Sequence, residues 1–160
     1  MSDAPDFGYY SHFPVLGAAL VETAQQYPYY PIVEFGCGHG STHLMHYGRA
    51  RRDVISADTD EKWFSEFSKY AGPNHRFELI KADVPGGSSG VNEYTEAWLR
   101  FIKPLNWIGL AFVDCAPGEA RVPIIKALKG KAKLIVAHDL CADDPPGGGN
   151  YRWRDLDGVF

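Results

Sequence analysis

The chain has 160 residues, of which 45% are apolar, and its formal net charge at pH 7 is -4. This length supports one hydrophobic core and is too short for two, so we predict a single domain over residues 1–160. The mildly acidic balance lacks the basic surplus typical of nucleic-acid-binding proteins, so nucleic acid is not expected as a partner.

Residues 1–28 are predicted to form an amino-terminal helical segment. Ser11 is the predicted N-cap, Pro14 suits the first turn, and the helix is expected to end before Pro28. One apolar stripe would bury this helix, and it consists of Phe13, Leu16, Leu20 and Ala24.

Residues 29–139 alternate between short apolar segments and segments with helical spacing. The predicted strands cover residues 31–35, 53–57, 77–81, 110–113 and 134–137. The predicted helices cover residues 41–48, 60–72, 92–103 and 119–129, and Asp60 is the expected cap of the second of these. This alternation predicts an α/β fold, a Rossmann-like three-layer α/β/α domain with a mainly parallel sheet of about five strands.

Two Gly- and Pro-rich stretches, residues 85–90 and 143–150, follow the third and fifth predicted strands. Both would lie at the carboxyl edge of the sheet, where they are candidate lids. The second belongs to a loop and tail, residues 140–160, that leaves little chain for further strands. We therefore expect carboxyl-terminal strands to be short or missing, and an exposed sheet edge would allow copies of the chain to associate.

A glycine-rich turn follows the first predicted strand, with Gly36, Gly38 and Gly40 preceded by Glu34. Glycines let a ligand approach the backbone, and the amide groups before a helix favour polar atoms. A pyrophosphate would be opposed by Glu34, whereas a ligand with an ammonium group would be attracted. The turn therefore favours a cationic nucleotide-like ligand over a dinucleotide.

Asp58 ends the second predicted strand, where a carboxylate can accept both hydroxyls of a ribose. The alternative is that an aspartate here caps the next helix. We assign capping to Asp60 and ribose binding to Asp58.

The sequence from Val33 to Gly40 resembles the first motif, E/D-x-G-x-G-x-G, of the class I S-adenosylmethionine-dependent methyltransferases. The resemblance implies S-adenosylmethionine as cofactor and an adenine contact from Asp83, after the third strand. The cofactor-binding residues that it implies are Glu34, Gly36, Cys37, Gly38, Gly40, Ser41, Asp58, Thr59, Asp83, Val84 and Asp114.

Asp114 after the fourth strand, and His138 and Asp139 after the fifth, resemble the strand endings of small-molecule O-methyltransferases. Catechol-type members bind a divalent metal there, so Asp114, His138 and Asp139 are candidate ligands for an ion such as Mg²⁺. His138 stands where those enzymes have an acid. Three interpretations stay open for these candidate catalytic residues: a metal site, a general base at His138, or a structural role.

The resemblance predicts a methyltransferase that acts on a small-molecule acceptor, preferably at a hydroxyl. The alternatives are a binding module without transferase activity and a nicotinamide-dependent oxidoreductase. The aromatic set Tyr9, Tyr10, His12 and Phe13 either covers the methionine end of the cofactor or packs in the core or an interface. The chain has three cysteines without a C-x-x-C pair, no apolar run that would span a membrane and no signal-peptide order at its start, so we expect a cytoplasmic protein without a membrane partner.

Overall fold

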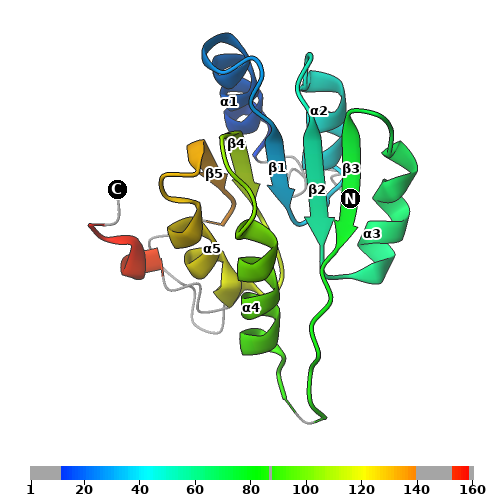
Figure 1. Cartoon of the computed structure of the whole chain (residues 1–160), viewed down its shortest axis with the longest axis vertical. Helices are drawn as coiled ribbons and strands as arrows, with labels where there is room; N and C mark the ends of the chain where they lie inside the picture. Colours follow the sequence, from blue (N-terminus) through cyan, green and yellow to red (C-terminus); the bar gives the residue numbers. More distant parts are fainter. Residues whose placement is uncertain (1–11, 87, 140–152, 159–160) are drawn as a thin grey trace, which may run out of the picture.

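The structure, a computed structural model, describes residues 12–86, 88–139 and 153–158, and its five strands form one parallel sheet in the order β3-β2-β1-β4-β5 (Figure 1). The strands are β1 (Ile32–Phe35), β2 (Val54–Asp58), β3 (His75–Leu79), β4 (Ile108–Val113) and β5 (Ala132–Ala137). The helices are α1 (Phe13–Gln26), α2 (Ser41–Gly48), α3 (Glu61–Phe67), α4 (Val91–Ile102) and α5 (Arg121–Leu128), with 3-10 turns η2 (Ser68–Tyr70), η3 (Gly118–Ala120) and η4 (Trp153–Leu156).

Helices cover both faces of the sheet, and each face has its own apolar cluster. On one face, Leu16 and Leu20 of α1 and Met45 of α2 pack against strand residues. On the other face, Trp98 of α4 and Ile124 of α5 do the same. The central strands β1 and β4 are buried along their whole length, which explains their apolar sequences. The predicted Rossmann-like three-layer α/β/α fold is confirmed.

Several element boundaries differ from the sequence-based expectation. Helix α1 begins at Phe13 with His12 at the N-cap position, whereas the predicted cap Ser11 lies outside the described residues. Strands β3, β4 and β5 begin about two residues before their predicted starts, because backbone pairing extends over polar residues and glycine. For example, His75 of β3 pairs with Val54 of β2. Asp60 caps α3 as predicted, since its side chain accepts from the amides of Lys62 and Trp63.

The two expected lids have different outcomes. Residues 143–150 lie outside the described residues. The segment after β3 runs far from the sheet before α4 begins (Figure 1), and none of its described residues lines the cavity of about 470 Å³ at the carboxyl ends of the strands. Beyond β5, the described residues add only η4, whose Leu156 packs against the cluster beside α5. Within the described ranges, no helix has the length and apolar character needed to cross a membrane.

Candidate functional site

A cavity of about 470 Å³ opens at the carboxyl ends of the strands. It joins the glycine turn after β1, the segment after β2, and acidic and imidazole groups after β4 and β5. Its lining consists of His12, Gly36, Cys37, Gly38, His39, Gly40, Ser41, Asp58, Asp60, Trp63, Asp114, Ala116, His138 and Asp139. The fold thus brings together nine of the residues expected at the site, Gly36, Cys37, Gly38, Gly40, Ser41, Asp58, Asp114, His138 and Asp139.

Gly36 holds the glycine turn against the end of β4. Its φ of +95° lies in the region that favours glycine, and a Cβ there would approach the Asp114 carbonyl oxygen to 2.4 Å. The amide of Asp114 in turn donates to the carbonyl of Phe35 at 2.8 Å. This close approach places the turn directly beside Asp114.

Glu34 differs from the expectation of ligand contact. Its side chain is 0% exposed and does not line the cavity, because alternate residues of β1 point to opposite faces and Glu34 points toward α2. The carboxylate accepts hydrogen bonds from Thr42 at 3.0 Å and from Ser56 at 2.5 Å, and the Thr42 hydroxyl accepts from the amide of Gly38 at 2.9 Å. Glu34 therefore braces the glycine turn from behind.

Burial raises the pKa of Glu34 to about 7, while hydrogen bonds from Ser41, Ser56 and Thr42 oppose the shift. Asp58 raises it slightly further by like-charge repulsion. The brace therefore contains a carboxyl group that titrates near neutral pH.

Asp58 connects the turn after β1 to the segment after β2. Its Oδ2 accepts from the amide of Cys37 at 2.6 Å, and its Oδ1 accepts from the amide of Asp60 at 2.8 Å. Burial raises the pKa of Asp58. Each carboxylate oxygen retains a further lone pair, so Asp58 can still accept hydrogen bonds from a ligand in the cavity.

Three other expected residues lie outside the cavity lining. Asp83 is exposed, and Val84 follows it along the segment that leaves the sheet. The Thr59 hydroxyl donates instead to the carbonyl of Ala116 at 3.2 Å, which ties the end of β2 to the end of β4. Trp63 of α3 lines the cavity together with Asp58, although it was not among the residues expected at the site.

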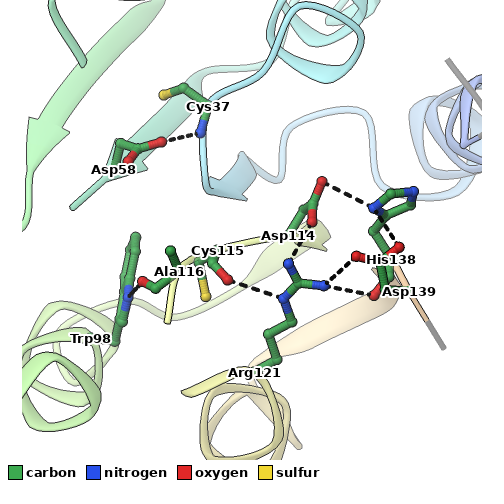
Figure 2. A network of polar contacts seen from close by, with 9 residues as sticks. All are labelled: Cys37, Asp58, Trp98, Asp114, Cys115, Ala116, Arg121, His138 and Asp139. Carbon is green, nitrogen blue, oxygen red and sulfur yellow. Dashed lines mark hydrogen bonds and ion pairs between the residues drawn. The ribbon is translucent and has the colours of Figure 1, made fainter. Parts of the chain in front are cut away.

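Arg121, at the start of α5, organises the acidic groups after β4 and β5 (Figure 2). Its guanidinium binds Asp114 Oδ1 at 2.8 Å and Asp139 Oδ2 at 3.1 Å. It also donates to the carbonyls of Cys115 at 3.0 Å and His138 at 3.1 Å. Local sequence spacing does not predict this role for Arg121, although two carboxylates that meet in a partly buried site require a neighbouring cation.

His138 lies between these two carboxylates, as Figure 2 shows. Its Nδ1 is 3.3 Å from Asp114 Oδ2 and 3.3 Å from Asp139 Oδ1. The hydrogen bond to Asp114 raises the pKa of His138, and desolvation opposes this shift. Asp139 has a φ of 59°, a strained conformation for a residue other than glycine, of the kind found at functional sites.

His12 completes this side of the cavity from the N-cap of α1. Its ring packs on Phe112 at 5.1 Å and edge-on to His138 at 5.0 Å between centroids. Both ring nitrogens are buried without a hydrogen-bond partner among the described residues. Desolvation and the neighbouring His138 lower the pKa of His12.

The expected Mg²⁺ ligands Asp114, His138 and Asp139 fit that ion poorly. Mg²⁺ requires an octahedral shell of oxygens, whereas here Arg121 already occupies one oxygen of each carboxylate and the third group is an imidazole. The donor atoms that converge are different, because single atoms of His12, Asp114 and His138 lie within 4.8 Å of one another.

The chain matches no protein-family model, no curated protein and no solved structure. The geometry of the cavity and the chemistry of its lining therefore carry the functional argument.

Proposed function

We propose that this protein is an S-adenosylmethionine-dependent methyltransferase that acts on a hydroxyl group of a small molecule. One observation carries the proposal: a single cavity connects the glycine turn and Asp58 to the imidazole and carboxylates after β4 and β5. The first part suits a nucleoside ligand, and the second part suits proton transfer. The cavity also lies where ligands bind in open α/β sheets.

The lining suggests how the cofactor would lie. Asp58 would accept from the ribose hydroxyls, and the indole of Trp63, stacked 5.8 Å from Phe67, offers an aromatic wall for adenine. The amides of the glycine turn would bind the methionine part. The methyl group would then point toward Asp114 and His138, which lie across the turn from Asp58.

The reaction is a direct displacement. The acceptor oxygen would form a bond to the methyl carbon while the carbon–sulfur bond breaks, and the electron pair of the carbon–sulfur bond would leave with S-adenosylhomocysteine. His138 accepts the hydroxyl proton, and Asp114 and Asp139 stabilise the resulting imidazolium. Arg121 keeps the two carboxylates in place, so that the catalytic group is aligned before the acceptor binds.

We also propose that the protein works in the reducing cytoplasm. Cys37 and Cys115 are free, buried thiols, and burial raises the pKa of both above the usual range for cysteine. Cys37 lines the cavity beside Asp58, where oxidation would disturb the turn.

Calorimetric titration with S-adenosylmethionine, S-adenosylhomocysteine and NAD tests the proposed ligand. Both sulfur ligands should bind, and Asp58→Asn should weaken them about 10- to 100-fold, the value of hydrogen bonds to a charged group. Asp53→Asn is the matched control, because Asp53 precedes the opposite end of β2 and its exposed carboxylate accepts a hydrogen bond from exposed Asn74 at 3.0 Å. The proposal fails if neither sulfur ligand binds.

NAD must be included because its ribose would present the same hydroxyls to Asp58. Tight binding of NAD alone would indicate an oxidoreductase. Methyl transfer is then measured with radiolabelled cofactor and a mixture of hydroxylated small molecules. Cofactor binding without transfer to any component would indicate a binding module.

A further inference from the structure

The imidazole of His12 lies at the cavity wall, and the described residues do not use its capacity for hydrogen bonding. Its two nitrogens are buried and have no hydrogen-bond partner within the described part of the chain. Leaving such a group without a partner is destabilising, so an orphaned polar group in a cavity indicates a binding partner such as a water, an ion or a ligand. His12 lines the same cavity as Asp114 and His138.

The neighbouring donors identify the chemistry of the missing partner. His12 comes from the start of α1, Asp114 from the end of β4 and His138 from the end of β5, yet their donor atoms lie within 4.8 Å of one another. A cation bound among them would be surrounded by two imidazoles and one carboxylate. Imidazole-rich sets suit Zn²⁺ and similar transition metals, whereas Mg²⁺ and Ca²⁺ require oxygen.

The surrounding charges allow a cation to bind here. Arg121 takes Asp114 Oδ1 at 2.8 Å, which leaves Oδ2 on the side of His138. The second carboxylate, Asp139, lies 3.3 Å from His138 Nδ1 and would orient that imidazole, an arrangement common around metal-bound histidines. Two carboxylates against one guanidinium leave a net negative charge at the site.

We propose that His12, Asp114 and His138 form a binding site for one divalent transition-metal ion, with Zn²⁺ preferred over Mg²⁺. The inference deepens the proposed function at the acceptor end of the same cavity: in protein loaded with Zn²⁺ the ion would lower the pKa of the acceptor hydroxyl, and in metal-free protein His138 would accept the proton. It does not require methyl transfer, since metal binding is measured on the protein without cofactor.

The test titrates chelator-treated protein with Zn²⁺ by calorimetry, with excess Mg²⁺ present in a parallel run. Co²⁺ provides a second readout, because its visible absorption reports the ligands around the ion. We expect one equivalent of Zn²⁺ to bind, and Mg²⁺ not to displace it. His12→Phe keeps the ring packed on Phe112 and should weaken binding more than about 100-fold, since even outer-shell partners contribute 10- to 100-fold.

His43→Phe is the matched control. His43 lies on α2, packs on Phe67 and does not line the cavity, so its loss should leave Zn²⁺ affinity unchanged. Thermal unfolding shows whether each variant folds: Zn²⁺ should raise the midpoint of wild type and His43→Phe, but not of His12→Phe. Metal-free His12→Phe should be at least as stable as wild type, because it removes two unpartnered nitrogens.

Equal Zn²⁺ affinity in wild type and folded His12→Phe would overturn the metal site. Absence of tight Zn²⁺ binding in wild type would also overturn it and assign the orphaned nitrogens to water. Displacement by Mg²⁺ would contradict the imidazole-rich coordination. If Zn²⁺ binding depends on His12 but S-adenosylmethionine does not bind, the metal site stands and the proposed function falls.

Discussion

At the scale of single residues, a buried chain of polar side chains runs behind the glycine turn. Ser56 donates to Glu34 and also meets His75 Nε2 at 2.9 Å. His75 Nδ1 in turn lies 3.0 Å from His46 Nδ1. When Glu34 is ionised, Ser56 gives its single proton to the carboxylate, so His75 then donates through Nε2. This series of polar side chains connects Glu34, which supports the glycine turn, to the partly exposed His46.

Glu34 should make stability fall as pH rises through the weakly acidic range. The unfolded side chain loses its proton near pH 4.5, whereas the folded side chain keeps it until about 7. Over that interval the folded state binds more protons, so Glu34 lowers the free energy of unfolding by about 3 kcal/mol. Glu34→Gln cannot ionise and should remove this contribution. Urea unfolding of wild type, Glu34→Gln and the control Asp53→Asn over this pH range measures it.

His75 opposes this trend, which makes the variant diagnostic. Burial, with smaller contributions from His46 and Arg49, lowers the pKa of His75 from 6.5 to about 4, so the unfolded state binds the extra proton between these values. In Glu34→Gln the opposing contribution of Glu34 is lost while that of His75 remains, so the free energy of unfolding of the variant should rise relative to that of wild type as pH increases. Asp58 also faces Glu34 and is unchanged in the comparison. Identical pH profiles for wild type and Glu34→Gln would contradict a carboxyl that titrates near neutral pH.

His138 is predicted to contribute to transfer and little to cofactor binding. Replacing the base by His138→Gln should lower kcat about 10²- to 10⁴-fold, the usual contribution of a general base. The affinity for S-adenosylhomocysteine should stay close to that of wild type, because His138 lies at the acceptor end of the cavity. The assay uses metal-free protein, since a metal-bound imidazole cannot accept a proton. His43→Gln is the control, and an equal loss of cofactor affinity and kcat would instead indicate a structural role.

At the scale of elements, the glycine turn was the most predictable part of the site and also the most constrained. Its glycine spacing is visible locally in the sequence, and the φ of +95° at Gly36 gives a physical reason for it. Strand starts were less predictable, because the pairing of β5 begins at Ala132 although Lys133 interrupts the apolar run. Local composition cannot show where backbone pairing continues.

Two glycine-to-alanine variants should have opposite effects on stability. Gly36→Ala forces a Cβ against the Asp114 carbonyl at 2.4 Å in an unfavourable backbone conformation, and should lower the free energy of unfolding by about 2–5 kcal/mol. Gly17→Ala is the matched control within α1, where no atom lies within 4 Å of the new Cβ. It should raise stability by about 0.5–1 kcal/mol. Equal stability of both variants in urea unfolding would contradict the tight packing of the turn.

At the scale of the whole molecule, long-range packing explains which site residues the sequence could not predict. Asp114, His138 and Asp139 end neighbouring strands, so a parallel sheet brings them together. The position of Asp83 also depends on the path after β3, and that segment leaves the sheet instead of returning to its edge. The outcome for Asp83 thus required the three-dimensional structure.

The positions of His12 and Arg121 at the site also depend on how the helices pack against the sheet. His12 reaches the cavity only because α1 packs across β4 and β5, and Arg121 because α5 begins beneath Asp114. Neither position has a distinctive spacing relative to the strand endings that it joins. Arg121 can be recognised as the partner of Asp114 and Asp139 only when the order of the strands in the sheet is known.

Cofactor binding should stabilise the whole domain, because the cavity is lined by residues that follow β1, β2, β4 and β5. A ligand that binds only the folded state at about 100 times its Kd adds about 2.7 kcal/mol, which corresponds to a rise of roughly 5–10 °C in Tm for a domain of this size. S-adenosylhomocysteine should produce this shift in wild type and Asp53→Asn. At the same ligand concentration, the stabilisation of Asp58→Asn should be smaller by about 1.3–2.3 kcal/mol, because its binding is 10- to 100-fold weaker. Scanning calorimetry measures all three, and a full shift in Asp58→Asn would place the ligand away from the end of β2.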